Sequence, residues 1–200
     1  YTMSRLTSPF VRRIFLAAVL LPLLVNLLLQ SYGWLVILGP GGMLNQTLMG
    51  LGLIKRPIML LYNQNGVLMG LVQTAFPLAV LPIASAMRGV ARSYEEAAAT
   101  LGASRFQVFR QVVLPMSLPG IITGATLVFA YNASSFVVPL LLGGRRVPML
   151  AVMVHDQIAP LMNWPAASAA GVVLIVTTLA IMTLSEYITG RRRRMLEASQ

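Results

Sequence analysis

Few side chains of this sequence could take part in acid–base, nucleophilic or metal chemistry, and they are scattered along the chain. The 200 residues include five Asp or Glu, one His and no Cys. His155 has no second metal ligand at a suitable spacing, and its neighbour Asp156 is an isolated acid. No HExxH or GxSxG motif occurs, so the motifs predict neither a zinc protease nor a serine hydrolase. We therefore expect a chain without enzymatic activity that binds no cofactor and no metal of its own.

The composition instead predicts an integral membrane protein. Hydrophobic residues make up 57% of the chain and charged residues only 10%. Four long stretches carry no Asp, Glu, Lys or Arg: Ile14 to Ile54, Pro57 to Met87, Gln111 to Gly144 and Gln157 to Ser185. A helix that spans a bilayer needs about 20 apolar residues. Because a backbone in lipid must satisfy its own hydrogen bonds, helices are the expected element.

We place four transmembrane helices, at about 13–31, 66–88, 118–141 and 166–188, in one polytopic all-α membrane domain that covers 1–200. The segment 43–65 is less apolar and contains Lys55 and Arg56. It is predicted to be an outer loop with a short interfacial helix.

The distribution of basic residues orients these helices. Four spans put both chain ends on one side, together with eleven of the fifteen Lys and Arg: Arg5, Arg12, Arg13, Arg88, Arg92, Arg105, Arg110 and Arg191 to Arg194. The positive-inside rule assigns that side, including the C-terminus, to the cytoplasm. The Arg191–Arg194 run then orients the last helix and contacts lipid headgroups. We accordingly do not interpret the net charge of +10 as a nucleic-acid site.

The cytoplasmic segment 89–118 is unusually ordered for a connection. Ser93 followed by Glu96 fits a capping box at a helix start, and the alanines 97–99 favour helix. Gly102 can end that helix in a left-handed conformation.

A second short helix is expected after Gly102. Ser104 followed by Gln107 fits another capping box, and Phe106, Phe109 and Val113 share one face. We expect Pro115 to end this helix and Pro119 to start the next span. Two capped helices joined at a glycine suggest a docking surface, although a loop that only connects two spans would satisfy the same pattern.

Polar residues occur inside the predicted span 118–141, at Tyr131, Asn132, Ser134 and Ser135. Polar groups at membrane depth face either a solute path or a neighbouring helix. For the two serines, hydrogen bonds between helices are the favoured interpretation, whereas for Tyr131 and Asn132 the two are balanced. Phe136 and Asp156 complete the candidate path. Asp156 could attract a cation or pair with Arg145 or Arg146.

The cytoplasmic segment resembles a known family. Glu96-Ala97-Ala98, then Gly102, Leu114-Pro115 and Pro119 are similar to the EAA loop of permeases from binding-protein-dependent ABC importers. Further matches resemble spermidine/putrescine-type permeases: Leu38-Gly39, Asn45-Gln46, Leu51 to Ile54, Leu61-Tyr62-Asn63, Gly66-Val67-Leu68, Phe136-Val137, Pro139, Leu142-Gly143-Gly144 and Trp164-Pro165.

The resemblance implies a type I ABC importer fold, usually of six spans, in the inner (cytoplasmic) membrane of a bacterium. Two N-terminal spans would then be missing, and Tyr1 to Arg5 would be the end of the second. It also implies that the EAA segment docks on a cytoplasmic ATPase dimer through Glu96, Ala97, Ala98, Gly102, Ala103, Leu114 and Pro115. ATP and Mg²⁺ would bind to that ATPase. The other implied partners are a second, different permease chain and a periplasmic or lipid-anchored solute-binding protein.

Two alternatives remain open at the level of sequence. Thiamine, iron or opine-like solutes use permeases similar to the polyamine ones. A secondary transporter driven by an ion gradient is also an apolar helix bundle, but such proteins commonly use intramembrane acids and repeats, and neither is visible here. The segment Gly39–Gly42 lacks the Gly-Lys-Ser/Thr of a phosphate loop, so the sequence predicts no ATP site of its own.

Overall fold

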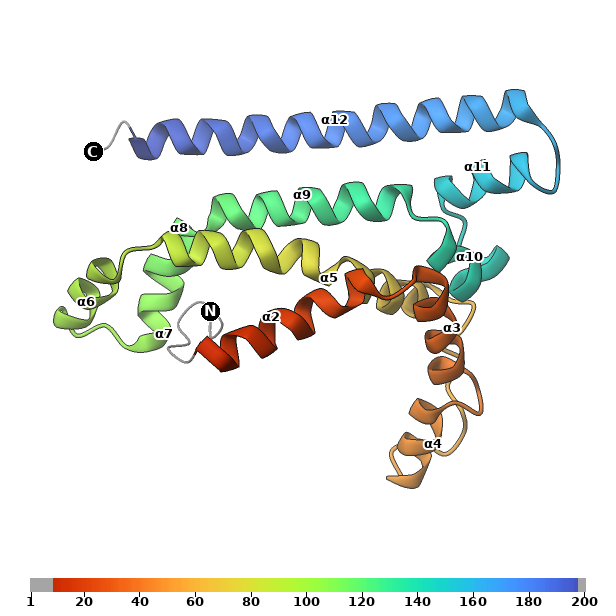
Figure 1. Cartoon of the computed structure of the whole chain (residues 1–200), viewed down its shortest axis with the longest axis horizontal. Coiled ribbons are helices and arrows are strands. Elements are labelled where there is room, and N and C mark those ends of the chain that lie inside the picture. Colours follow the sequence, from red (N-terminus) through yellow and green to blue (C-terminus); the bar gives the residue numbers. More distant parts are fainter. Residues whose placement is uncertain (1–8, 198–200) are drawn as a thin grey trace. The chain divides into compact units, whose positions relative to one another are not determined.

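A computed structural model of the chain describes residues 9–197, of which the side chains of Pro9, Arg12, Arg145 and residues 188–197 are not described. Every regular element within 9–197 is helical, as Figure 1 shows. The elements are α2 (Pro9–Leu24), α3 (Leu27–Leu38), α4 (Met43–Gly50), α5 (Gln64–Gly89), α6 (Arg92–Thr100), α7 (Arg105–Val108), the π-helix η1 (Phe109–Val113), α8 (Leu114–Met116), α9 (Leu118–Ser134), α10 (Val137–Gly143), the 3₁₀-helix η2 (Gly144–Arg146), α11 (Leu150–Ile158) and α12 (Trp164–Glu197). The predicted all-α class is confirmed.

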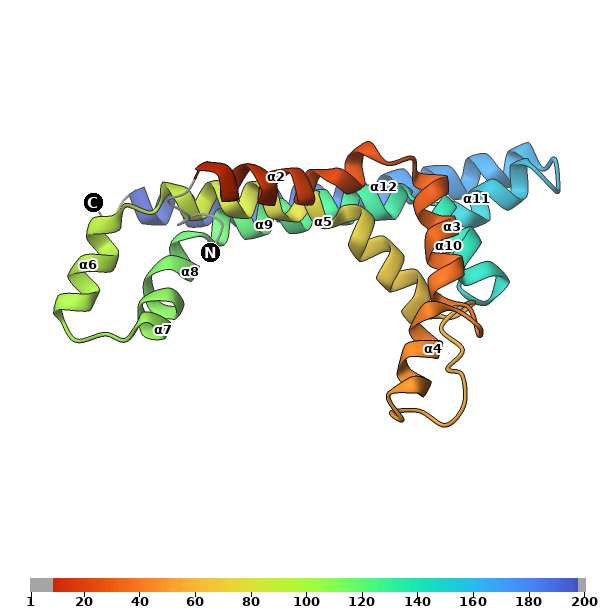
Figure 2. The same cartoon turned by 60° about the horizontal axis from the view of Figure 1, so that its bottom comes forward.

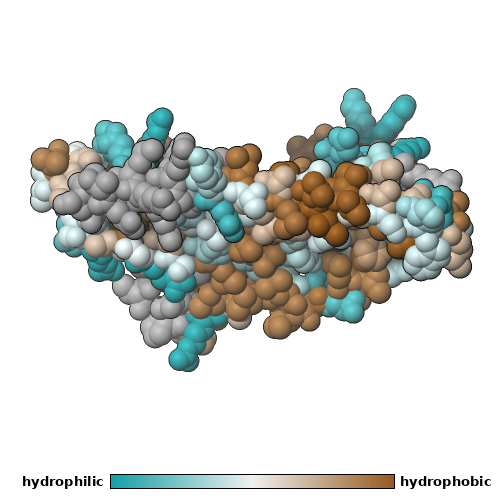
Figure 3. All heavy atoms as spheres, turned by 90° about the horizontal axis from the view of Figure 1, so that it is seen from above, coloured by the Kyte–Doolittle hydropathy of each residue, from teal (hydrophilic) through white to brown (hydrophobic). Residues whose placement is uncertain are grey.

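Within residues 9–197, three helical stretches are long and apolar enough to cross a membrane: Leu27–Gly50, Gln64–Gly89 and Trp164–Tyr187. The helices Arg105–Met116 and Leu118–Ser134, bent by 64°, make a fourth if they count as one span. The first stretch is interrupted, because α3 ends at Leu38 and α4 begins at Met43. Apolar side chains gather on the exposed surface (brown in Figure 3), as expected of helices that meet lipid or partner helices.

Two of the predicted spans are confirmed, and two are wrong as single helices. Helix α5 matches 66–88, and α12 contains 166–188. The predicted span 13–31 is broken after Leu24, where the side chain of Asn26 accepts a hydrogen bond from Leu28 N–H at 2.8 Å and caps α3. The amide of Gln30 donates to the carbonyl of Val25 at 2.8 Å. These polar side chains replace the backbone bonds that the break removes.

The predicted span 118–141 is broken at Ser135 and Phe136. Pro139 lies three residues into α10, and a proline inside a helix would leave the carbonyl four residues earlier without a donor. Starting a new helix at Val137 puts Pro139 in a first turn, where no backbone N–H is needed.

The described part of the chain divides into two compact units: residues 9–20, 76–130 and 180–197 form unit 1, and 21–75 with 131–179 form unit 2. Unit 1 contains the segment 89–118, with a buried cluster of Met87, Val108 and Val113. Unit 2 is centred on Val67, Leu71, Val138 and Leu142. It also contains α4, the short helix predicted within 43–65.

Candidate functional site: a helical hairpin and an interrupted helix

The segment from α6 to α8, residues 92–116, forms a helical hairpin in unit 1, and its turn is built by local sequence. Figure 2 shows α6 and α7 as its two arms. Gly102 adopts φ +84°. The N–H of Ala103 donates to Ala98 O at 3.1 Å and that of Gly102 to Ala99 O at 3.0 Å. These two bonds define a Schellman motif, so the prediction for Gly102 is confirmed.

The two predicted capping boxes have different outcomes. At the second helix, Ser104 N–H donates to Gln107 Oε1 at 2.7 Å, and Gln107 N–H donates to Ser104 Oγ at 3.4 Å, so that capping box is confirmed. The one at Ser93 and Glu96 is wrong, because α6 begins earlier, with Ala91 at its N-cap and no side-chain cap bond. Val90 is only 3% exposed. Because Val90 is buried, the chain turns directly after α5, and the N-cap of α6 is Ala91, two residues before the predicted N-cap Ser93.

Pro115 does not end the second helix. The helical path continues through α8 to Met116, and the turn before it is a π-helix, in which Leu114 N–H donates to Phe109 O. Proline offers no N–H to the carbonyl of Gln111, and the wider π turn accommodates this. Val108 and Val113 are both buried in the unit 1 cluster, and their spacing of five residues fits a π turn better than an α turn.

The predicted coupling residues divide into a partly buried and an exposed group. Ala98 and Ala103 pack against the buried cluster of Met87, Val108 and Val113, so they are part of the hairpin's own core. Glu96, Ala97, Gly102 and Pro115 are exposed, and Leu114 is half-buried.

Large apolar side chains are also exposed on this hairpin, with Leu101 at 88% and Phe106 at 69%. Beside them lies a hollow of about 320 Å³ lined by Ala98, Leu101, Gly102, Ala103, Gln107 and Gln111. Leu101 was not predicted as a contact residue from the sequence. A signal was available, because this leucine precedes a left-handed glycine and belongs to no apolar repeat. Exposed apolar side chains around a hollow suit protein contact.

The predicted path residues gather where α9 ends, in unit 2. The hydroxyl of Ser134 donates to Tyr131 O at 3.0 Å. Asn132 Oδ1 and Ser135 Oγ are buried and have no hydrogen-bond partner among the described residues. Buried polar atoms without a hydrogen-bond partner are uncommon in protein interiors.

Phe136 and Asp156 are brought together through His155, which sequence reasoning had left without a role. The rings of Phe136 and His155 stack with centroids 5.1 Å apart. His155 Nδ1 lies 3.3 Å from Asp156 Oδ1. Among the described side chains Arg146 forms no ion pair with Asp156, and the side chain of Arg145 is not described. Within the described residues, no group of three His, Asp or Glu is placed to hold a metal ion.

Other polar residues of the predicted spans serve packing within unit 2. Gln73 Oε1 accepts from Trp34 Nε1 at 3.3 Å, and the buried hydroxyl of Thr74 donates to the carbonyls of Gly70 and Leu71.

Comparison with known proteins shows the family of this chain. Residues 2–194 match the family of binding-protein-dependent transport system inner membrane components. This chain belongs to that family. Its fold is that of an ABC transporter permease: it superimposes with a TM-score of 0.77 on a chain of a bacterial ABC transporter involved in the import of the acidic polysaccharide alginate. That match is 18% identical and covers 95% of this chain and 69% of the other.

Two relatives are more similar in sequence. The spermidine/putrescine transport system permease protein PotB of Haemophilus influenzae is 35% identical over 98% of this chain and 67% of its own length. PotB of Escherichia coli K12 is 31% identical over 93% of this chain and 66% of its own length. The chain therefore spans about two thirds of the length of these relatives.

Proposed function

We propose that this chain is a permease subunit of an ATP-driven importer and forms part of the path for a polyamine such as spermidine or putrescine. The observation that carries the proposal is the similarity to spermidine/putrescine permeases over nearly the whole chain. The family match and the permease fold support the same class of protein. The partners we propose are an ATPase dimer, a second permease chain and a solute-binding protein. A related solved structure is an alginate transporter in complex with its periplasmic protein.

The helical hairpin 92–116 is the proposed docking surface for the ATPase, on the cytoplasmic side. Its exposed members Glu96, Ala97, Gly102 and Pro115 would contact the ATPase, with Leu101 and Phe106 as apolar anchors. Ala98, Ala103 and Leu114 would act by holding the hairpin rigid. ATP and Mg²⁺ would remain on the ATPase, and its closure would move α5 and α9, the helices that flank the hairpin in the chain.

Ala97→Trp tests the docking surface. Ala97 is exposed, so a large side chain there should change stability by less than about 0.5 kcal/mol while it blocks close approach of a partner. We expect the assembled transporter to lose ATP-driven uptake and the stimulation of ATP hydrolysis by loaded binding protein. Ala169→Trp, at another exposed alanine on α12, is the matched control. If the Ala97→Trp variant couples ATP hydrolysis to uptake normally, the helix face that carries Ala97 does not contact the ATPase.

Uptake into proteoliposomes tests the energy source and the solute. With the partner subunits present, labelled spermidine should accumulate only with ATP on the cytoplasmic side and should be unaffected by a protonophore. Uptake that ignores ATP and collapses with the proton gradient would instead identify a secondary transporter. Thiamine, ferric iron, an opine and 2-aminoethylphosphonate should compete poorly. The last is included because a putative 2-aminoethylphosphonate permease of Salmonella is 30% identical over 78% of this chain.

The proposed solute path passes the end of α9, at Tyr131, Asn132, Ser134, Ser135 and Phe136, and continues to Asp156. The buried side-chain oxygens of Asn132 and Ser135 support this path, because no described residue forms a hydrogen bond with them. A solute ammonium group or a partner helix could supply these donors.

A further inference from the structure

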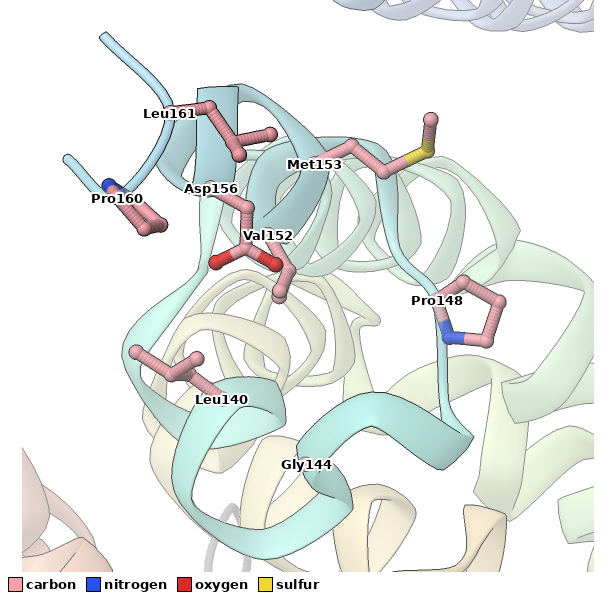
Figure 4. A pocket seen from close by; sticks show the side chains of 8 residues that line it. All are labelled: Leu140, Gly144, Pro148, Val152, Met153, Asp156, Pro160 and Leu161. Carbon is pink, nitrogen blue, oxygen red and sulfur yellow. The ribbon is translucent and has the colours of Figure 1, made fainter. Parts of the chain in front are cut away.

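Unit 2 contains a pocket of about 550 Å³ formed entirely by the segment 140–161 (Figure 4). Its lining comes from α10, the connection after it, α11 and the turn that follows: Leu140, Gly144, Pro148, Val152, Met153, Asp156, Pro160 and Leu161. Figure 4 shows the carboxylate of Asp156 directed from α11 into the space above Leu140 and Gly144. The volume lies within the range of sites for small organic molecules.

Asp156 is the only acidic side chain that this pocket has. It is also the only Asp or Glu between Ala97 and Ser185. Its side chain is 45% exposed and that of His155 is 34% exposed. The described polar contact of the carboxylate is from Oδ1 to His155 Nδ1 at 3.3 Å. The second oxygen, Oδ2, therefore has no described partner and is available to a ligand.

His155 is held at one edge of the carboxylate by its stacking on Phe136. The nearest described basic residue in sequence, Arg146, is exposed and makes no ion pair with Asp156. A carboxylate that is partly removed from water and keeps one oxygen without a described partner favours a cation, because the Coulomb attraction grows as the effective dielectric falls.

The other described side chains that line the pocket are apolar. Leu140, Val152, Met153 and Leu161 present aliphatic carbon or sulfur, and two prolines add ring carbons. One carboxylate surrounded by aliphatic walls matches a ligand with a charged end and a methylene chain: the ammonium pairs with oxygen, and the chain loses contact with water. An anionic or fully polar solute would find no partner of this kind.

We propose that this pocket binds a primary alkylammonium group, with Asp156 as its charged contact and the aliphatic walls holding the attached methylenes. Its part in transport rests on the function proposed above and makes Asp156 a specificity-determining residue for amines. Binding of an alkylammonium group depends only on the pocket. The proposed binding site and the proposed transport function can therefore be disproved separately.

A single cysteine makes occupancy of the pocket measurable, because the chain has no native Cys. Leu161 lines the pocket and is 61% exposed, so Leu161→Cys places a reactive thiol at its wall while Asp156 is kept. In the assembled transporter, without binding protein, we measure the rate at which N-ethylmaleimide labels this thiol. The probes are putrescine, n-butylammonium and the neutral n-butanol. Labelling should slow about fivefold when the free amine is about four times its Kd, and n-butanol should have little effect.

The double variant Leu161→Cys with Asp156→Asn should lose this protection, and Asp156→Glu should retain part of it. Ser168→Cys, an exposed position on α12 outside the pocket lining, is the control and should not be protected. The proposal is overturned if n-butanol protects as well as the amines do, if Asp156→Asn leaves protection intact, or if protection appears only when binding protein is present.

Uptake by the wild-type chain separates this site from the proposed function. If the wild-type transporter imports no amine but n-butylammonium protects the thiol of the Leu161→Cys variant, the site stands and the polyamine assignment falls. If spermidine uptake is ATP-driven and Asp156→Asn neither slows it nor removes protection, the importer stands and the site falls.

Discussion

At the scale of residues, one buried amide organises the segment between α3 and α5. Asn45 is 0% exposed. Its Nδ2 donates to the carbonyls of Gly39 and Ile58, each at 3.0 Å, and its Oδ1 accepts from Ile58 N–H at 2.8 Å. A single side chain thus joins the end of α3 to the chain that follows α4. Buried polar groups of this kind are costly to leave unpaired.

Asn45→Leu should loosen this segment. The change removes three hydrogen bonds and leaves the N–H and the carbonyl of Ile58 without the side-chain partner, whereas the carbonyl of Gly39 keeps its bond from Gly42 N–H at 2.9 Å. The loss should cost about 2–4 kcal/mol. Hydrogen exchange of residues 39–58 in the purified protein should then accelerate strongly. Gln46→Ala is the control, since Gln46 is exposed and makes one bond, to Gly41 O at 2.9 Å; it should change exchange little. Equal acceleration in both variants would contradict the role of Asn45.

At the scale of elements, α5 and α9 approach closely in unit 1 because α9 carries glycines. A Cβ on Gly120 would lie 2.3 Å from Ala86 Cβ and 2.6 Å from Pro82 O, and one on Gly124 would lie 3.0 Å from Ala79 O. Without a hydrophobic drive between helices in lipid, such close contact supplies much of the packing energy.

Gly120→Ala should therefore destabilise the chain, because the backbone carbonyl of Pro82 cannot move aside cheaply. The expected loss is about 1–3 kcal/mol, seen as a lower melting temperature in detergent. Gly171→Ala on α12 is the control, since a Cβ there meets nothing within 4 Å. It should be neutral or stabilising by up to about 1 kcal/mol. A Gly120→Ala protein that melts at the wild-type temperature would show that the two helices separate easily.

Local sequence predicted some of these elements well and others poorly. The apolar runs of α5 and α12 were long enough to be recognised, and the turn at Gly102 and the capping box at Ser104 depend on residues within six positions. The break at Asn26 was missed, because an asparagine within an apolar run is equally compatible with a packed helix. The early start of α6 was missed because it depends on the burial of Val90, and the π turn because it depends on the packing of Val108 and Val113.

At the scale of the whole molecule, charge and hydropathy suggest the topology. In the most apolar 18 residues of Trp164–Tyr187, only 6% of the residues are buried, so the surface of α12 is left for lipid or a partner chain. The predicted cytoplasmic side carries most of the arginines. This orientation, with the hairpin 92–116 inside, is required if an ATPase is to dock there.

Cysteine labelling tests that topology. Thr100→Cys lies on the hairpin and Met43→Cys at the start of α4, and both positions are exposed. In intact spheroplasts we expect a membrane-impermeant maleimide to label the Met43→Cys variant at once and the Thr100→Cys variant only after permeabilisation, because the bilayer blocks the reagent. Unmodified protein has no thiol and serves as the control. The reverse pattern would invert the orientation and exclude ATPase docking at this hairpin.

The sequence alone determined the membrane class, the two uninterrupted long helices, the turn chemistry at Gly102 and the resemblance that the family match confirmed. These features depend on composition and on short-range spacing, which can be read without knowing which residues are neighbours in the folded protein. The tertiary structure decided where α2–α3 and α9–α10 break, which alanines of the hairpin pack against its buried cluster, and that Phe136, His155 and Asp156 meet beside a pocket. Those outcomes depend on which side chains from distant positions exclude water from one another, and no local pattern encodes that pairing.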